Sequence, residues 1–129
     1  EFGTIFAMRG STIGQSVYIG SFCTIGLVHI GDDTLIGSNV DIVGSGKVHR
    51  FERTDIPIRH QGGEIQAVRV GRDAWIGNSA VVLAEIGDGV VVGAGSVVVK
   101  PCEAYGIYVG NPARLIRKRG DDRSWKTPV

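Results

Sequence analysis

The sequence predicts an all-β fold, a parallel solenoid in which short strands stack coil upon coil. Three observations indicate it. Aliphatic residues recur every six positions, many of them are followed directly by glycine, and the 20 glycines are spread among Val and Ile instead of being gathered in a linker. A fixed period of this kind is typical of repeat architectures. An α-helix, with a period of about 3.6 residues, and a simple strand, with a period of about 2, do not give such a beat.

The aliphatic positions fall into four runs and should form the inner surface of a prism. They are Ile13, Ile19 and Ile25; Ile30, Ile36, Ile42 and Val48; Val70, Ile76 and Val82; and Ile86, Val92 and Val98. Glycine after an inward residue permits either unusual turn angles or a close approach of two backbones. Because each coil buries its inner face only against its neighbours, the coils have to stack.

Composition limits the classes of partner. A chain of 129 residues fits one domain, and its formal net charge of +1 does not favour nucleic acid or an anionic membrane as a partner. There is no apolar run of the roughly 20 residues needed to span a bilayer, and the first residues do not resemble a signal peptide. Cys23 and Cys102 fit neither a metal motif nor a disulfide framework. We therefore expect two free thiols and a cytoplasmic protein.

The repeat stops after Val48. Residues 49–67 carry no six-residue position, and they contain two of the three histidines, His49 and His60. A long excursion inside a regular solenoid is usually functional or disordered. We expect an extruded loop here.

The hexads resemble the [LIV]-G-x-x-[STAV]-x repeat of the hexapeptide acyltransferases, over about residues 11–119. This resemblance implies a left-handed parallel β-helix; the hand comes from the family, because parallel β crossovers generally favour the right hand. It further implies a homotrimer with sites between subunits. We expect a β-helix domain over 1–119 with an active-site loop at 49–67, a short C-terminal helix, and a tail over 120–129.

The loop is similar to that of the maltose, galactoside and polysaccharide O-acetyltransferases. The similarity lies in Val48-His49-Arg50-Phe51, Pro57-Ile58 and Gln61-Gly62-Gly63. It implies an acetyl-CoA-dependent O-acetyltransferase in which the acceptor hydroxyl attacks directly and His49 is the catalytic base. A neutral imidazole, with an ordinary pKa of about 6.5, suits that role. The alternative is that His49 is a surface histidine without a role.

The other histidines and the loop acids receive weaker hypotheses. His60 is a candidate contact to the acceptor substrate, and His29 is expected at a coil corner. Glu52, Asp55 and Glu64 could orient His49 or bind acceptor hydroxyls, but solvated loop charge is the preferred explanation for each. No metal is expected. A zinc enzyme like the γ-type carbonic anhydrases remains an alternative with three histidines, here 20 and 11 residues apart.

The C-terminal half carries the coenzyme resemblance. It lies in Val70-Gly71-Arg72-Asp73-Ala74-Trp75-Ile76-Gly77, in Val92-Gly93-Ala94-Gly95-Ser96-Val97-Val98-Val99-Lys100, and in Gly110-Asn111-Pro112-Ala113-Arg114-Leu115-Ile116. Position by position, it implies Trp75, Asn78 and Ala94 beside the pantetheine arm of coenzyme A and Lys100, Arg114 and Arg117 near its phosphates. Basic side chains suit phosphate groups.

Structural roles compete with these assignments. Asn78 and Ala94 could simply fit the coil, and Arg117 could belong to the solvated end of a helix. A non-enzymatic trimeric β-helix scaffold needs only the repeats. The acceptor substrate stays open: the loop favours a small molecule with a sugar hydroxyl, while antibiotic and amine acceptors are served by similar repeats.

Overall fold

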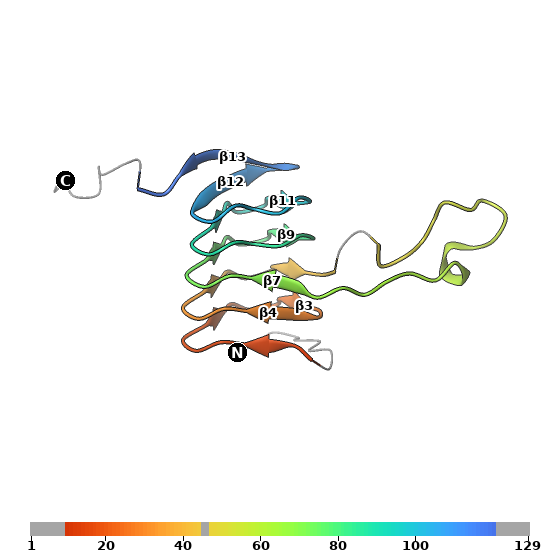
Figure 1. The fold of residues 1–129 in the computed structure, drawn as a ribbon, viewed down its shortest axis with the longest axis horizontal. Coiled ribbons are helices and arrows are strands. Elements are labelled where there is room, and N and C mark those ends of the chain that lie inside the picture. Colours follow the sequence, from red (N-terminus) through yellow and green to blue (C-terminus); the bar gives the residue numbers. More distant parts are fainter. Residues whose placement is uncertain (1–9, 45–46, 121–129) are drawn as a thin grey trace.

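The computed structural model describes residues 10–44 and 47–120, which form a three-faced prism of stacked coils (Figure 1). The first face holds β1 (Thr12–Ile13), β4 (Val28–Ile30) and β7 (Val68–Val70). The second face holds β2 (Tyr18–Ile19), β5 (Leu35–Ile36), β8 (Trp75–Ile76), β10 (Val91–Val92), β12 (Gly106–Gly110) and β13 (Ala113–Lys118). The third face holds β3 (Thr24–Ile25), β6 (Asp41–Ile42), β9 (Val81–Val82) and β11 (Val97–Val98).

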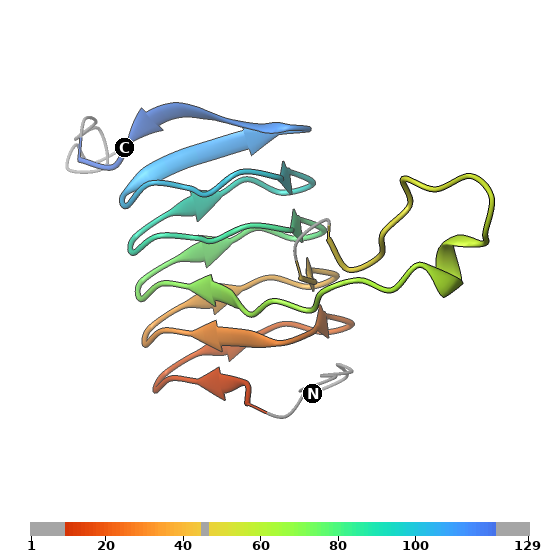
Figure 2. The same ribbon diagram turned by 45° about the vertical axis from the view of Figure 1, so that its right-hand side comes forward.

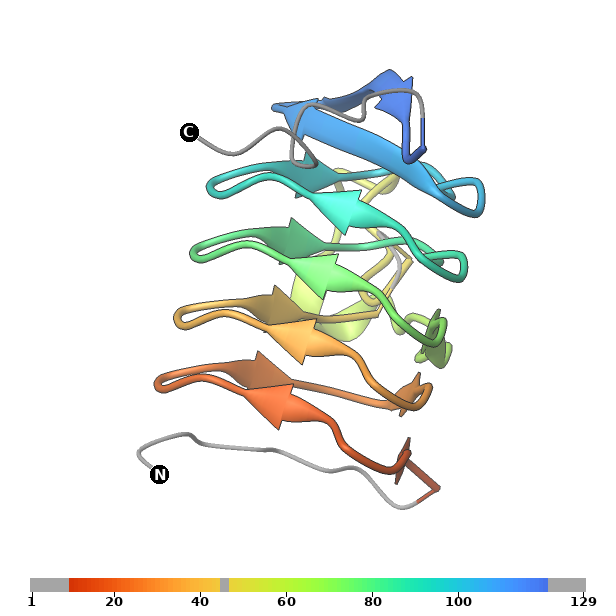
Figure 3. The same cartoon turned by 90° about the vertical axis from the view of Figure 1, so that its left-hand side faces the viewer.

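Neighbouring strands on each face are parallel and come from successive coils. Isolated parallel bridges from Val70 to Ile86 and from Ile86 to Cys102 continue the first face. Figure 3 shows the coils stacked one above another. Only the pair β12–β13 among the strands of the described residues is antiparallel.

The predicted six-residue positions form the core. Those from Ile25 to Ile42 and from Val70 to Val98 are at most 3% exposed. Ile13 is 46% exposed because it lies in the first of the described coils, where no described coil covers it from below. The prediction that Val48 continues the six-residue repeat is wrong. Val48 follows β6 in the extruded loop and lies outside every strand of the described residues.

Most glycines that follow an inward aliphatic residue serve close approach and not an unusual turn angle; Gly26, with its nearest contact at 3.5 Å, is an exception. A Cβ on Gly31 would lie 2.6 Å from the Arg72 nitrogen of the next coil, and one on Gly71 would lie 2.6 Å from the Asp88 nitrogen. The positive φ angles come two residues later, at Asp33 (61°) and Asp73 (53°). Aspartate tolerates this left-handed conformation better than most residues do. In each of these coils, glycine permits the close approach of two backbones, and the aspartate two residues later makes the turn.

The predicted extruded loop is confirmed. The chain leaves the prism after β6 on the third face and returns at β7 on the first face, and the loop stands away from the coils (Figure 2). Its one helical element is the 3-10 turn η1 (Ile58–His60). Within the described ranges, no helix is long and apolar enough to cross a membrane.

The predicted short C-terminal helix is wrong. Residues Ala113–Lys118 form β13, which turns back after Asn111-Pro112 and pairs antiparallel with β12. The reason is that β12 ends the stack and would otherwise leave one row of backbone N–H and C=O groups unpaired, and a returning strand pairs them whereas a helix does not. The tail predicted over 120–129 lies, apart from Gly120, outside the described residues.

Candidate functional site

His49 lies in a narrow two-armed stem, which we define as residues 47–50 and 62–64. The Glu64 N–H donates to the Lys47 carbonyl at 2.9 Å, and the Arg50 N–H donates to the Gly62 carbonyl at 2.9 Å. Each of these bonds joins the two arms, one before His49 and one after it. The backbone of His49 is therefore held from both sides although no regular strand forms there.

The His49 side chain is exposed and lines a cavity of about 360 Å³ at the stem. The cavity is also lined by Lys47, Arg50, Phe51, Glu52 and Glu64. The sequence suggested that nearby acids orient the imidazole, but the acids bond elsewhere. Glu64 pairs with Arg50 at 3.7 Å, and Glu52 accepts the Phe51 N–H at 3.1 Å.

Asp55 is likewise engaged, by Arg53 in the loop tip (residues 51–61). The Arg53 Nε donates to Asp55 Oδ1 at 2.9 Å, and a second short bond joins Arg53 Nη2 to Asp55 Oδ2. The Arg53 guanidinium holds the pKa of the Asp55 carboxyl below its usual range. None of the three candidate acids is hydrogen-bonded to His49 within the described part of the chain.

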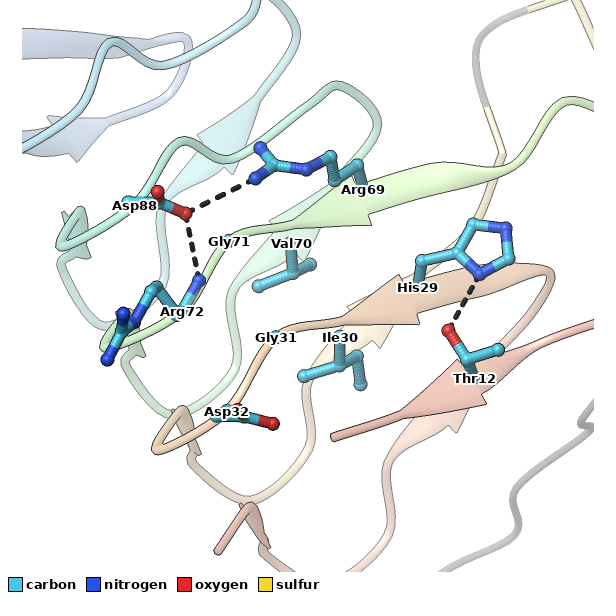
Figure 4. Close-up of a pocket in the computed structure, with 10 residues that line it drawn as sticks. All are labelled: Thr12, His29, Ile30, Gly31, Asp32, Arg69, Val70, Gly71, Arg72 and Asp88. Atoms are coloured by element: carbon cyan, nitrogen blue, oxygen red, sulfur yellow. Dashed lines mark hydrogen bonds and ion pairs between the residues drawn. The ribbon is translucent and has the colours of Figure 1, made fainter. Parts of the chain in front are cut away.

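The three histidines lie in three different places. His60 ends η1 in the loop tip and is exposed. His29, predicted at a corner, instead lies in the middle of β4, where its Nδ1 shares a 2.8 Å hydrogen bond with Thr12 Oγ1 on β1 (Figure 4). Ile25 and Ile30 are five positions apart, one fewer than the repeat period, and the strand that contains His29 is three residues long. No group of three His, Cys, Asp or Glu side chains in residues 10–44 and 47–120 could hold a metal ion.

The first face carries a pocket that the sequence did not reveal (Figure 4). It measures about 500 Å³. Arg69 reaches Glu85 and Asp88 at 3.3 Å each, and Asp88 also accepts the Arg72 N–H at 3.0 Å. These partly exposed pairs join Arg69 to the next coil and neutralise its charge.

The predicted pantetheine contacts lie on the second face and at its corner with the third. Trp75 points outward from β8 and is 55% exposed, in register with Leu35 on β5 and Val91 on β10. Asn78 and Ala94 follow β8 and β10 and are both exposed. These three predicted residues are thus close to one edge of the prism.

Asn78 has a structural role in the coil. Its Oδ1 accepts the Ser38 N–H at 2.9 Å, as the Ser38 hydroxyl oxygen accepts the Ser21 N–H at 3.1 Å one coil earlier. Ala94 occupies the next place in this column and has no side-chain acceptor. The column of side-chain acceptors therefore ends at Ala94. The side chains at this corner are small, and the space beside it is open, since a Cβ on Gly95 would meet nothing within 4 Å.

Lys100 lies at a different edge, the corner between the third and first faces, from which the loop also leaves. A cavity of about 510 Å³ at this edge extends from the loop root to the residues on either side of Lys100. It is lined by Lys47, Gln66, Ala67, Val68, Arg69, Leu83, Ala84, Glu85, Val99 and Pro101. In one chain, then, His49 and Lys100 lie at one edge of the prism and Asn78 and Ala94 at another.

The basic C-terminal residues separate into two groups. Arg114 and Arg117 are exposed on β13, opposite Val109 and Ile107. Lys118 pairs with Glu103 at 3.8 Å.

Arg119, which the sequence did not single out, holds three coils together. Its guanidinium donates to Asp73 Oδ2 and to the Gly89 carbonyl at 3.0 Å each, and lies 5.9 Å from the ring centre of Tyr105.

The chain matches the family model described as the hexapeptide repeat of succinyl-transferase, over residues 11–40, 27–45 and 67–100. It is 32% identical over 126 residues to a probable macrolide acetyltransferase of Lysinibacillus sphaericus, covering 85% of this chain and 64% of that protein. It is 34% identical over 124 residues to a chloramphenicol acetyltransferase of Klebsiella aerogenes, covering 84% of this chain and 54% of that protein. The chain thus spans less than two thirds of the length of either relative.

Among solved structures, a maltose O-acetyltransferase from Clostridium difficile 630 superposes with a TM-score of 0.70 at 27% sequence identity. The superposition covers 92% of this chain and 66% of that one. Together with the parallel three-faced coil, this similarity and the repeat match confirm the predicted left-handed parallel β-helix.

Proposed function

The chain belongs to the hexapeptide-repeat acyltransferase family, and we propose that it is an acetyl-CoA-dependent O-acetyltransferase with His49 as the catalytic base. One observation carries the proposal. The repeat is interrupted by an extruded loop whose stem holds the backbone of His49 on both sides while its imidazole is exposed on a cavity. A base that receives a proton from an incoming substrate needs both a fixed position and access.

The proposed reaction needs one proton transfer by the protein. The neutral imidazole of His49 takes the proton of the acceptor hydroxyl as the hydroxyl oxygen forms a bond to the acetyl carbonyl carbon. The bond from that carbon to the sulfur of the donor breaks, and the imidazolium returns the proton to the thiolate. Acetyl-CoA supplies a carbonyl that is already activated as a thioester, so a covalent enzyme intermediate is not required.

The proposed coenzyme contacts are Trp75, Asn78 and Ala94 for pantetheine and Lys100, Arg114 and Arg117 for the phosphates. The surface fits such a ligand. The coil corner at Ala94 and Gly95 is open, which lets an extended chain approach the backbone. Lys100 and Arg114 are exposed cations, whereas Arg119 is occupied by its bonds within the prism.

We propose a homotrimer with sites between subunits, and the division of these residues supports it. His49 belongs to the edge between the third and first faces, and Ala94 to the edge between the second and third. A second copy would place the loop of one chain beside the corner of another. The second face supports such packing, because Tyr18, Leu35 and Trp75 form an outward column on successive coils, each about half exposed.

For the acceptor we propose a sugar or a similar small molecule with a free hydroxyl. The support is the loop resemblance and the maltose O-acetyltransferase neighbour. His60 in the loop tip is the proposed acceptor contact. Cys23 and Cys102 are both free and buried, which suits a reducing compartment, and we propose the cytoplasm.

The test is a thiol-release screen with acetyl-CoA and a panel of sugars, nucleotide sugars and antibiotics, run with the wild type and with His49→Ala. We expect acetyl transfer to at least one hydroxyl acceptor, and a loss of about 100-fold or more in His49→Ala, the range of general base catalysis. Equal rates in the two proteins would remove His49 from the mechanism. No transfer to any acceptor, with no coenzyme A binding by calorimetry, would favour a scaffold.

A further inference from the structure

Gln61 joins the two arms of the loop tip through its side-chain amide. Its Oε1 accepts the Arg53 N–H at 3.1 Å, and its Nε2 donates to the Arg53 carbonyl at 2.8 Å and to the Ile56 carbonyl at 3.0 Å. The residue is half-buried in a tip whose side chains are mostly exposed. An amide is required here because one end of the group has to accept while the other donates twice.

The next two residues extend this contact to the stem. Gly62 has a φ of 77°, and its carbonyl accepts the Arg50 N–H. A Cβ on Gly63 would lie 1.8 Å from the Val48 carbonyl oxygen, so the arms touch backbone to backbone beside His49. We call residues 61–63 the clasp. The clasp hydrogen-bonds to Arg50 and Arg53, which follow His49, and it packs against Val48, which precedes His49.

The loop has little else to hold it. The hydrogen bonds and ion pairs of residues 49–66 in the described chain all end within residues 47–66. The prism therefore fixes only where the loop starts and ends. The placement of the imidazole relative to the prism depends on bonds inside the loop, among which the clasp spans the two arms.

We propose that Gln61 is a positioning residue for His49, acting through the clasp, in the acetyl transfer proposed above, on which this inference rests. Without the amide, the tip regains backbone freedom, which has to be lost again before the imidazole is in place. A catalytic group that is misplaced by about 1 Å loses up to about 100-fold in rate. Coenzyme binding and the stability of the prism do not depend on the amide.

The experiment compares Gln61→Ala and Gln61→Glu with Gln66→Ala, a change of the same type at an exposed loop glutamine whose amide has one long bond of 3.4 Å, to Glu64. We expect kcat to fall about tenfold or more in both Gln61 variants. The KM for acetyl-CoA and the Tm should stay at wild-type values. Hydrogen exchange should speed up at the Arg50 and Arg53 amides. Gln66→Ala should match the wild type in every measurement.

Gln61→Glu adds a readout that a general structural defect would not give. Its ionised carboxylate would face the Arg53 and Ile56 carbonyls and donate to neither, whereas the protonated acid can donate to one of them. The kcat of Gln61→Glu relative to wild type at the same pH should therefore rise as the pH falls through the range where a glutamate protonates, about 4 to 5. The ratio for Gln61→Ala should not change over that range.

The two proposals fail in different ways. If His49→Ala is inactive while Gln61→Ala keeps wild-type kcat, the positioning role is wrong and the base assignment stands. If Arg50 and Arg53 exchange equally fast in Gln61→Ala and wild type, the clasp does not hold the stem; this result needs no activity. If the wild type shows no acetyl transfer but Gln61→Ala loosens the stem, the clasp is real and the proposed function is wrong.

Discussion

Among residues 10–44 and 47–120, the interior coils of the prism hydrogen-bond to the coils before and after them, whereas loop residues 49–66 hydrogen-bond only within residues 47–66. Ile76 in β8 lies between Ile36 and Val92 on neighbouring coils of the same face, and all three are at most 1% exposed. His49 is held by two backbone bonds across a stem. Repetition stabilises the prism, and we propose that the interruption supplies the catalytic base. Substitutions in the two regions should therefore affect different measurements.

The largest effect is expected from Gly31→Ala in the prism. The added Cβ would meet the backbone of Gly71 and Arg72 at 2.6–2.7 Å, and backbone cannot move aside as a side chain can. We expect a loss of about 3 kcal/mol in the free energy of unfolding, measured by urea titration. Gly26→Ala is the matched control, since its nearest contact would be an ordinary 3.5 Å. Equal losses in the two variants would show that coil spacing does not require the glycine.

Gly63→Ala makes the same change in the loop and should give the opposite pattern. The Cβ would overlap the Val48 carbonyl and push the arms apart beside His49. We expect kcat to fall by about 100-fold, from misplacement of the base, with an unchanged Tm. Thr54→Ala, in the exposed tip, should have wild-type kcat. A lower Tm in Gly63→Ala would mean that the loop supports the prism, contrary to the comparison.

Arg119→Ala tests a contact that joins three coils at the end of the prism. The ion pair with Asp73 is partly exposed and contributes little alone, but the bond to the Gly89 carbonyl and the Tyr105 ring add to it. We expect a loss of about 1 kcal/mol in unfolding free energy. Lys118→Ala, which removes only an exposed pair with Glu103, should stay within about 0.5 kcal/mol of wild type. A larger loss for Lys118→Ala would contradict this ranking.

The last prediction concerns pH. Burial raises the pKa of the Cys102 thiol to about 11, above the value of about 8.5 for an exposed thiol. The unfolded chain thus releases this proton first, and the stabilisation present below about pH 8.5 is lost as the pH rises toward 11. The free energy of unfolding should fall further between pH 7 and pH 10 in the wild type than in Cys102→Ala. Identical losses would show that the thiol ionises equally easily in both states.

The prism could be predicted from the sequence because each coil repeats the same requirement. The six-residue spacing alone predicts that Ile36, Ile76 and Val92 point inward. The strand β13 could not be predicted, because its pairing with β12 is set by an unpaired edge at the end of the stack and has no period. Arg119, whose guanidinium contacts three coils, is not marked by any period either.

The site was predictable to a smaller extent. The break after the repeat located the loop, and the resemblance singled out His49. The bond from Asn78 to the Ser38 N–H and the clasp at Gln61 are contacts between residues 40 and 8 positions apart, respectively, in sequence. Such contacts depend on how coils stack and on where two arms meet, so no local pattern of residue types reveals them.

The central claim is that the prism binds the coenzyme while the loop supplies the base. It is tested most directly by one His49→Ala sample, measured for coenzyme A binding by calorimetry and for acetyl transfer in the same buffer. We predict a Kd within about twofold of wild type and a turnover lower by about 100-fold or more. Turnover that persists, or binding that is lost along with turnover, would contradict the account.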